Sequence, residues 1–128
     1  MDDPTIKDDW MLYRRIVSDW FVPDPKTPSG RRITSQAFND SSDGTSMSIQ
    51  IEQEMENFGL TIEDILKNYP DLGLASFSAG FARSQKQGVI RKPLDMDPAH
   101  GEVVGEKPRS IRRIFAENAN IIIEPKIQ

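Results

Sequence analysis

Apolar and polar side chains alternate in several short segments of the chain, which is the pattern of β-strands with one covered face. The clearest case is 46–52, where Met47, Ile49 and Ile51 occupy every second position. A strand is also predicted at 10–17, with a short helix as the alternative because the alternation there is imperfect. Further strands or extended segments are predicted at 33–38, 89–92, 100–104 and 121–123.

The strand at 46–52 has a candidate partner just before it in the chain. The pair Asp43-Gly44 lies between the two segments and is typical of a tight turn. We therefore expect 33–38 and 46–52 to form a hairpin. The proline-rich residues 18–30 precede it and are predicted to be a loop, because proline fixes φ and donates no amide hydrogen.

Apolar residues recur at helical spacing in two other segments. The first helix is predicted at 62–68, because Thr61 and Asp64 have the spacing of a capping box and Pro70 follows. The second helix is predicted at 108–119, where a proline opens the first turn and an apolar stripe follows.

Residues 72–84 fit two interpretations. Alternation and small side chains favour a strand, whereas Phe77 and Phe81 are also spaced as on one face of a helix. We expect a strand that leads into a helical turn near 79–84.

The apolar run Ile121 to Ile123 predicts a central strand that is covered on both faces. Together with the other segments it predicts an α+β fold, in which one small domain at 10–128 has a mixed β-sheet and two main helices. Residues 1–9 are acidic, contain a proline and are expected to form a flexible N-terminal arm.

The core is expected to hold the apolar residues of these periodic segments. They are Ile49, Ile51, Ile65, Leu66, Phe77, Phe81, Ile114, Phe115 and Ile122. A chain of 128 residues buries about two thirds of its unfolded surface, so such a core can fold unaided. Cysteine is absent, which excludes disulfides, cysteine-ligated zinc and a thiol nucleophile.

The composition also limits the cellular setting. The N-terminus, Met1-Asp2-Asp3, lacks the apolar core of a signal peptide. The chain contains no run of about 18 apolar residues that could span a bilayer. We therefore expect a soluble, cytoplasmic protein of bacterial type that has no membrane partner.

Charge is distributed unevenly along the chain. Residues 39–72 hold one lysine against eight carboxylates, whereas the chain as a whole carries a net charge of -4. This segment is either a solvated surface or an acidic face for a basic partner. The acidic pI of about 5.0 argues against nucleic acid, so Arg109, Arg112 and Arg113 are interpreted as a solvated helix face.

His100 is the single histidine of the chain, and it follows a proline-bent turn at the start of a predicted strand. Its ordinary pKa of about 6.5 suits acid–base catalysis. The alternative is a structural histidine whose ring nitrogens bind nearby loop backbone. Ser48, on the polar face of its strand, is the candidate to work beside it.

Arg31 and Arg32 follow a Pro-Ser-Gly turn and, with the hydroxyls of Thr34 and Ser35, could clamp a phosphate or a carboxylate. The alternative is a pair of exposed arginines beside a strand. We expect one of the arginines, Ser35, Ser48 and His100 to line a single cleft. No P-loop, G-x-G-x-x-G or G-x-S-x-G sequence occurs, and neither a metal nor a cofactor is predicted.

Four segments resemble a group of small uncharacterised bacterial proteins that share S-x-A-F, a serine-bearing strand and P-x-H-x-x-V. They are Leu12-Tyr13-Arg14-Arg15, Ser35-Gln36-Ala37-Phe38, Met47-Ser48-Ile49 and Asp97-Pro98-Ala99-His100-Gly101-Glu102-Val103. This resemblance implies no settled activity. A more distant similarity is to compact folds that bind NAD and transfer ADP-ribose, although this chain lacks their Gly-Arg-Trp-Asn type of signature.

Two functions follow from these observations. The first is a small accessory or interaction module, of the immunity or adaptor type, that binds a larger protein partner. The second is a small enzyme or receptor for a phosphorylated nucleotide-type ligand, similar to ADP-ribosyl transfer. In that case Arg31 or Arg32 would hold the anion, Ser35 and Ser48 would line the cleft, and His100 would be the acid or base.

Overall fold

A computed structural model describes residues 1–40, 44 and 46–126. Within them lies one small α+β domain, as the sequence predicts. The expected turn residue Asp43 falls outside the described residues.

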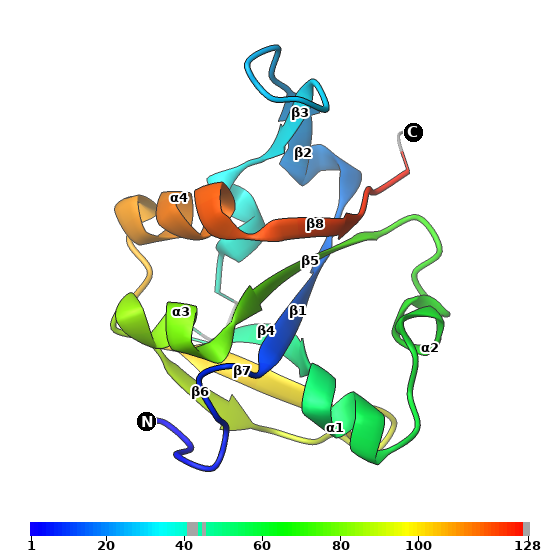
Figure 1. The fold of residues 1–128 in the computed structure, drawn as a ribbon, viewed down its shortest axis with the longest axis vertical. Helices are drawn as coiled ribbons and strands as arrows, with labels where there is room; N and C mark the ends of the chain where they lie inside the picture. Colours follow the sequence, from blue (N-terminus) through cyan, green and yellow to red (C-terminus); the bar gives the residue numbers. More distant parts are fainter. Residues whose placement is uncertain (41–43, 45, 127–128) are drawn as a thin grey trace.

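The main element is a six-stranded sheet within the described residues, in the order β6-β7-β4-β1-β5-β8 (Figure 1). Each pairing in this sheet is antiparallel. The strands are β1 (Met11–Ile16), β4 (Ser46–Ile51), β5 (Gly73–Ser78), β6 (Gly88–Arg91), β7 (His100–Val104) and β8 (Asn120–Ile123).

A separate two-stranded ribbon takes the place of the predicted hairpin. β2 (Phe21–Pro23) pairs with β3 (Arg31–Ile33), and the amide of Asp24 donates to the carbonyl of Gly30 at 2.7 Å across its loop. The prediction that 33–38 pairs with β4 is therefore wrong. Those residues continue into the 3₁₀ segment η2 (Ser35–Phe38), and β3 pairs instead with β2 in the proline-rich segment before it.

Local sequence signals set the helices. Thr61 and Asp64 form the predicted capping box, and Ser78 accepts from the amide of Phe81 at 3.0 Å to begin the helix after β5. Residues 72–84 therefore contain both predicted elements, because a strand is followed by a helix. The helical elements are α1 (Glu52–Asn57), α2 (Ile62–Leu66), α3 (Ala79–Ser84), α4 (Arg109–Asn118) and the 3₁₀ segment η1 (Ser18–Trp20).

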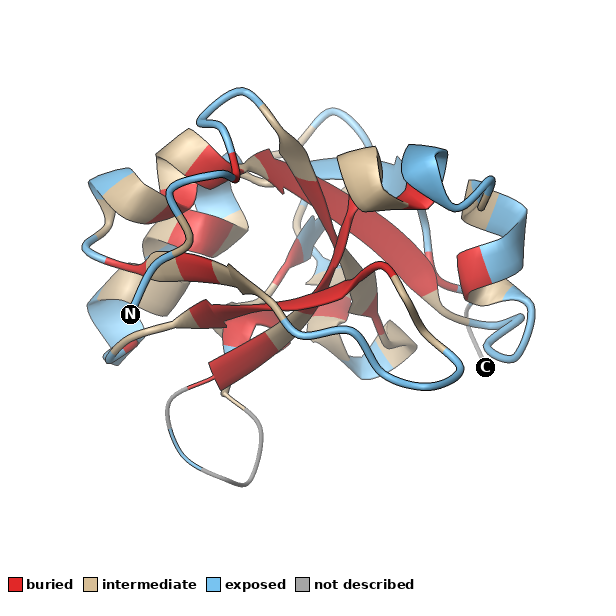
Figure 2. Cartoon of the chain, turned by 90° about the horizontal axis from the view of Figure 1, so that it is seen from below, coloured by how far each residue is buried: buried red, intermediate tan, exposed pale blue. Residues whose placement is uncertain are grey.

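Both faces of the sheet pack apolar residues, and the buried positions concentrate in its strands (Figure 2). On one face Phe77 meets Phe115 of α4, with ring centroids 5.1 Å apart. On the other face Leu74 and Tyr13 pack with Met55 of α1 and Ile65 of α2. Of the predicted core, five residues are buried: Ile49, Ile51, Ile65, Phe77 and Phe115. Leu66, Phe81 and Ile114 are half-buried.

β8 is an edge strand, so the prediction of a covered central strand is wrong. It pairs with β5 alone among the described strands, and Ile122 is 45% exposed. A register shift opposite Leu74 and Ala75 leaves Ile122 as the extra residue of a bulge. A Cβ at Gly73 would lie 2.4 Å from the carbonyl oxygen of Ile123, so this glycine is what allows the strand to approach.

The N-terminal residues 1–9 pack on the domain, in contrast to the flexible arm expected from their composition. Ile6 is fully buried, and the amide of Asp3 donates to the carbonyl of Val89 at 2.8 Å. Arg83 of α3 pairs with the carboxylate of Asp8 at 2.7 Å. The buried side chain of Ile6 and these polar contacts attach the segment to the domain, although its acidic, proline-containing composition predicts a detached arm.

Candidate functional site

A cleft of about 890 Å³ lies between the ribbon and the α4–β8 segment, and it is the larger of the two clefts described here. In Figure 1 the ribbon stands above α4 and β8, which follow one another in a line. One wall, called the ribbon wall below, comes from the ribbon together with η1 and η2, and the other from α4 and β8. The wall residues from the ribbon side are Asp19, Val22, Asp24, Thr27, Arg32, Ile33, Thr34, Ser35 and Gln36. Those from the other side are Arg109, Arg113, Ala116, Glu117, Ala119 and Ile121.

The three arginines of α4 have different surroundings, although the sequence assigns them to one solvated face. Arg112 donates from Nη1 to Oδ1 of Asn39 at 2.7 Å and from Nε to the carbonyl of Lys107 at 3.1 Å. Arg109 and Arg113 are exposed and line the cleft, and their side chains make no hydrogen bond or ion pair with the described residues. These two guanidinium groups are therefore available to an anion.

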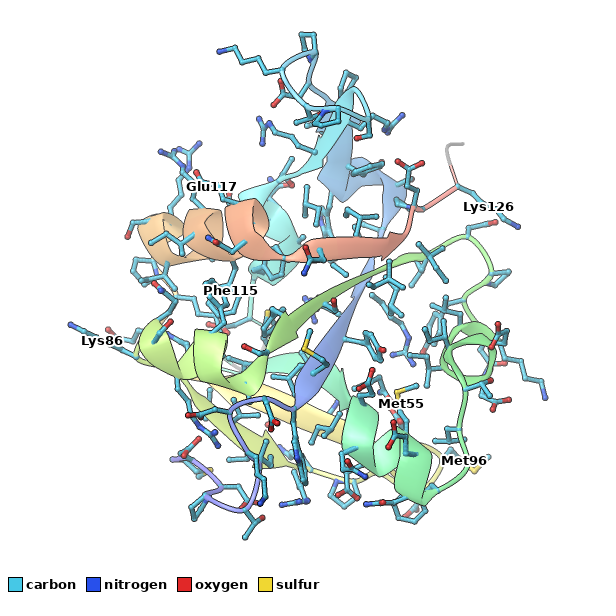
Figure 3. All side chains as sticks on the ribbon, in the orientation of Figure 1. Met55, Lys86, Met96, Phe115, Glu117 and Lys126 are labelled. Carbon is cyan, nitrogen blue, oxygen red and sulfur yellow. The ribbon has the colours of Figure 1, made fainter. Side chains whose placement is uncertain are left out.

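The first turn of α4 also lacks any negative group. It contains no acidic residue, and its N-cap, Pro108, provides no side-chain hydrogen bond. The positive end of the helix dipole therefore adds to the charges of Arg109 and Arg113 at this end of the cleft. Glu117 follows one turn after Arg113, and Figure 3 shows it on the opposite side of α4 from Phe115.

The ribbon wall contains polar side chains with hydrogen-bonding atoms that no described residue uses. Thr34 also lines the cleft, but its hydroxyl oxygen is itself sealed from solvent and has no hydrogen-bond partner among the described residues. Ser35 lies beside it at the start of η2. Arg32 reaches Asp24 at 3.3 Å while its side chain stays 54% exposed, so the ion pair leaves donors free.

Arg31 is not part of this cleft lining. Its guanidinium lies 4.8 Å from the ring centroid of Phe21, and its Nη2 donates to the carbonyl of the same residue. Of the predicted anion-binding residues, the structure therefore brings Arg32 and Ser35 together and uses Arg31 to hold the ribbon.

His100 and Ser48 lie in a different place. His100 pairs with Gln50, and Ser48 with Glu102, so these four side chains share one face of the adjacent strands β4 and β7. Neither His100 nor Ser48 lines either cleft. The single cleft expected for all the predicted site residues is therefore not found.

The geometry of His100 fits the structural alternative. The residue is 9% exposed, and its Nδ1 lies 2.9 Å from the carbonyl oxygen of Lys92. Beside it, Gln50 donates to the carboxylate of Asp97 at 2.8 Å, which holds the 93–99 loop over the sheet. Glu102 is also buried and lies 3.5 Å from the ammonium of Lys92.

Several carboxylates of the acidic segment are engaged within the fold. Glu52 accepts from the hydroxyl of Tyr13, and Glu54 lies 3.2 Å from Nε of Arg91. Asp40 pairs with Lys107, whose side chain is fully buried, and Asp64 caps α2. The segment is thus less available as an acidic docking face than its composition indicates.

No cluster of three or more metal-ligating side chains occurs among the residues that the structure describes. Nor does any helix in that part of the chain have the length and hydropathy needed to cross a bilayer.

Three cleft residues carry no sequence signal that assigns them to a site, namely Arg109, Arg113 and Ile121. The i, i+4 spacing of the arginines was visible in the sequence, but a solvated helix face has the same pattern. What distinguishes them is the wall opposite, which comes from residues about 80 positions earlier in the chain.

Comparisons with known proteins provide no further assignment: no protein-family model, curated protein or solved structure matches this chain.

Proposed function

We propose that this protein is a small binding module that attaches to a larger protein partner through the free edge of β8. The observation that supports the proposal is the exposure of three consecutive isoleucines on that strand. Ile121, Ile122 and Ile123 are 36%, 45% and 37% exposed. Burying apolar surface contributes about 25 cal/mol per Å², so a partner that covers these side chains would stabilise the complex.

Lysine and proline, which usually hinder edge-to-edge association, are absent from this edge, whereas the bulge at Ile122 and the short length of β8 are the protective features that it does have. Exposed edges are commonly protected by lysine or proline within the strand. The β8 sequence, Asn120 to Ile123, contains neither, and the first proline follows at Pro125. An edge of this kind accepts an added strand from another chain, which supplies main-chain hydrogen bonds and side-chain contacts.

The proposal includes a cytoplasmic, bacterial setting of the accessory or immunity type. The absence of cysteine supports the cytoplasm, where disulfides are rare.

One observation favours a second candidate, a receptor for a phosphorylated nucleotide-type ligand. Arg32 and Ser35, both expected to bind such an anion, line the large cleft together. The enzymatic form of this candidate has less support, because His100 lies outside the cleft lining and its ring is held by backbone. We therefore place the binding module first.

Site-specific photo-crosslinking in the organism that encodes the protein tests the proposal. A photoreactive phenylalanine analogue replaces Ile122 in one variant and Phe58, which is 56% exposed at the end of α1, in a matched control. We expect a discrete adduct with a larger protein from position 122 and none from position 58.

The outcome that contradicts the proposal has two forms. One is an absence of adducts at position 122, or the same adducts from both positions. The other is an adduct of twice the chain's mass, since that would identify a second copy as the occupant. Adding Ile121→Lys to the position 122 variant should abolish the expected adduct, because a charge at the edge opposes strand addition.

A further inference from the structure

We infer that the partner segment is an extended strand with an acidic side chain, which lies between Arg109 and Arg113 while an apolar part of the segment covers Ile121. The inference rests on the proposed function and specifies the chemistry of the partner. Two features of the large cleft support it, namely its continuity with the strand edge and the distribution of its charges.

The cleft and the free edge are continuous. Ile121 belongs to both, because it lies on the edge strand and lines the cleft. α4 runs directly into β8, with Ala119 as its C-cap. A helix rises about 1.5 Å per residue, so Arg109 lies roughly 15 Å along the axis from Ala119. An extended chain covers that distance in about five residues.

The charges along α4 indicate which part of the segment is acidic. Arg109 and Arg113 are one turn apart, and like charges at this spacing destabilise a helix by about 0.2–0.5 kcal/mol. A carboxylate between them would relieve the repulsion and would also meet the positive end of the helix dipole. A phosphate would suit the same pair of groups, but the apolar strand edge beside them favours a polypeptide.

The acidic residues of the cleft restrict where a carboxylate can bind. Asp24 is already paired with Arg32 at 3.3 Å, so its charge is largely compensated. Glu117 lies two turns from Arg109 and near β8, where it would repel an acidic group. Asp19, on the ribbon wall, adds a further negative charge. A binding segment should therefore be acidic only at the end that reaches the start of α4.

The test is a selection of random ten-residue peptides displayed on phage against the wild-type protein. We expect enrichment of sequences in which a β-branched apolar run is followed or preceded, about five residues away, by aspartate or glutamate. The dissociation constant of a synthetic copy of the enriched peptide is then measured at low and high salt.

Two pairs of substitutions with the same change in charge provide the comparison. Arg109→Gln with Arg113→Gln should weaken the peptide by about tenfold or more at low salt, because charge-assisted contacts are lost. Lys67→Gln with Lys86→Gln, at exposed positions outside the cleft lining, should leave the affinity within about twofold. High salt should reduce the difference between the two pairs.

Failure of this inference is distinguishable from failure of the proposed function. Peptides that lose binding with Ile122→Lys but tolerate the arginine substitutions would overturn the acidic-segment inference and leave the binding module in place. Enriched peptides without acidic residues would also overturn it, as would a selection that enriches nothing. If inorganic phosphate or ADP raises the melting temperature only when both arginines are present, and no peptide is enriched, the cleft is a small-anion site and the inference is wrong.

Discussion

At the scale of single residues, Arg14 shows how a polar side chain can organise the centre of this fold. Its Nε donates to the carbonyl of Ala37 at 2.9 Å and its Nη1 to that of Ser48 at 2.8 Å. Burial lowers the pKa of Arg14 to about 10, so the side chain remains cationic at neutral pH. One guanidinium thus joins η2 to β4, which are separated by part of the chain that is not described.

Tyr13, its neighbour on the opposite face of β1, should make stability depend on alkaline pH. Burial is the largest cause and the hydrogen bond to Glu52 the second, and together they raise the pKa of Tyr13 from 10.0 to about 12. Below about pH 10 the Tyr13 hydroxyl is protonated in both the folded and the unfolded chain, so Tyr13 makes its full contribution to the free energy of unfolding. Between about pH 10 and about pH 12 only the folded chain retains this proton, and the free energy of unfolding therefore falls as pH rises.

Tyr13→Phe should flatten this part of the pH profile, measured by urea unfolding at a series of alkaline pH values. Tyr69→Phe is the matched control, because it removes the hydroxyl of the other tyrosine, a residue that is 46% exposed. A slope that survives in Tyr13→Phe, or that disappears in Tyr69→Phe, would contradict the assignment.

At the scale of elements, the two sides of α4 have different surroundings. Its inner side inserts Phe115 among Phe38, Phe77 and Phe81, with ring centroids 5.6, 5.1 and 5.1 Å away. Its outer side presents Arg109, Arg113 and Glu117 to the cleft. The aromatic contacts hold the helix at a fixed position on the sheet, so they also define the width of the cleft.

Phe115→Ala should therefore lower the free energy of unfolding by about 3–5 kcal/mol, because it removes a fully buried ring and leaves a cavity. Chemical denaturation measures the change. The control, Phe58→Ala, removes an exposed ring and should stay within about 0.5 kcal/mol of the wild type. Equal effects of the two substitutions would mean that α4 does not pack on the sheet.

At the scale of the whole molecule, the first residues of the chain close the side of the fold formed by α3 and β6. Arg83 pairs with Asp2 and Asp8, and Arg91 pairs with Asp3. These side chains are partly exposed, so each pair contributes little by itself. The buried side chain of Ile6 is the stronger attachment.

Ile6→Ala should accordingly destabilise the entire domain by about 2–5 kcal/mol, seen as a lower midpoint in a single denaturation transition. Leu94→Ala, at a position 51% exposed, should leave the midpoint unchanged. An unaltered midpoint in Ile6→Ala would support the detached arm that the composition predicts.

Local elements could be predicted from the sequence because their causes are local. The alternation at Met47, Ile49 and Ile51 predicts β4, and the capping box of Thr61 and Asp64 predicts α2. Side-chain periods of 2.0 and 3.6 residues and hydrogen bonds across three residues need no information from the rest of the chain. The same reasoning identified Arg32 and Ser35, which lie beside one proline-rich turn and do line a common cleft.

Only the tertiary structure decided which elements become neighbours. Three consecutive isoleucines predict a covered strand because their side chains are apolar. Whether Ile122 is covered, however, depends on a further neighbouring strand, and the described residues provide none on that side of β8. Likewise β3 pairs backward with β2, and His100 lies on a polar face away from Arg32. Strand pairing is a competition among distant segments, decided by the burial and loop closure of the whole chain, and a local pattern does not contain that outcome.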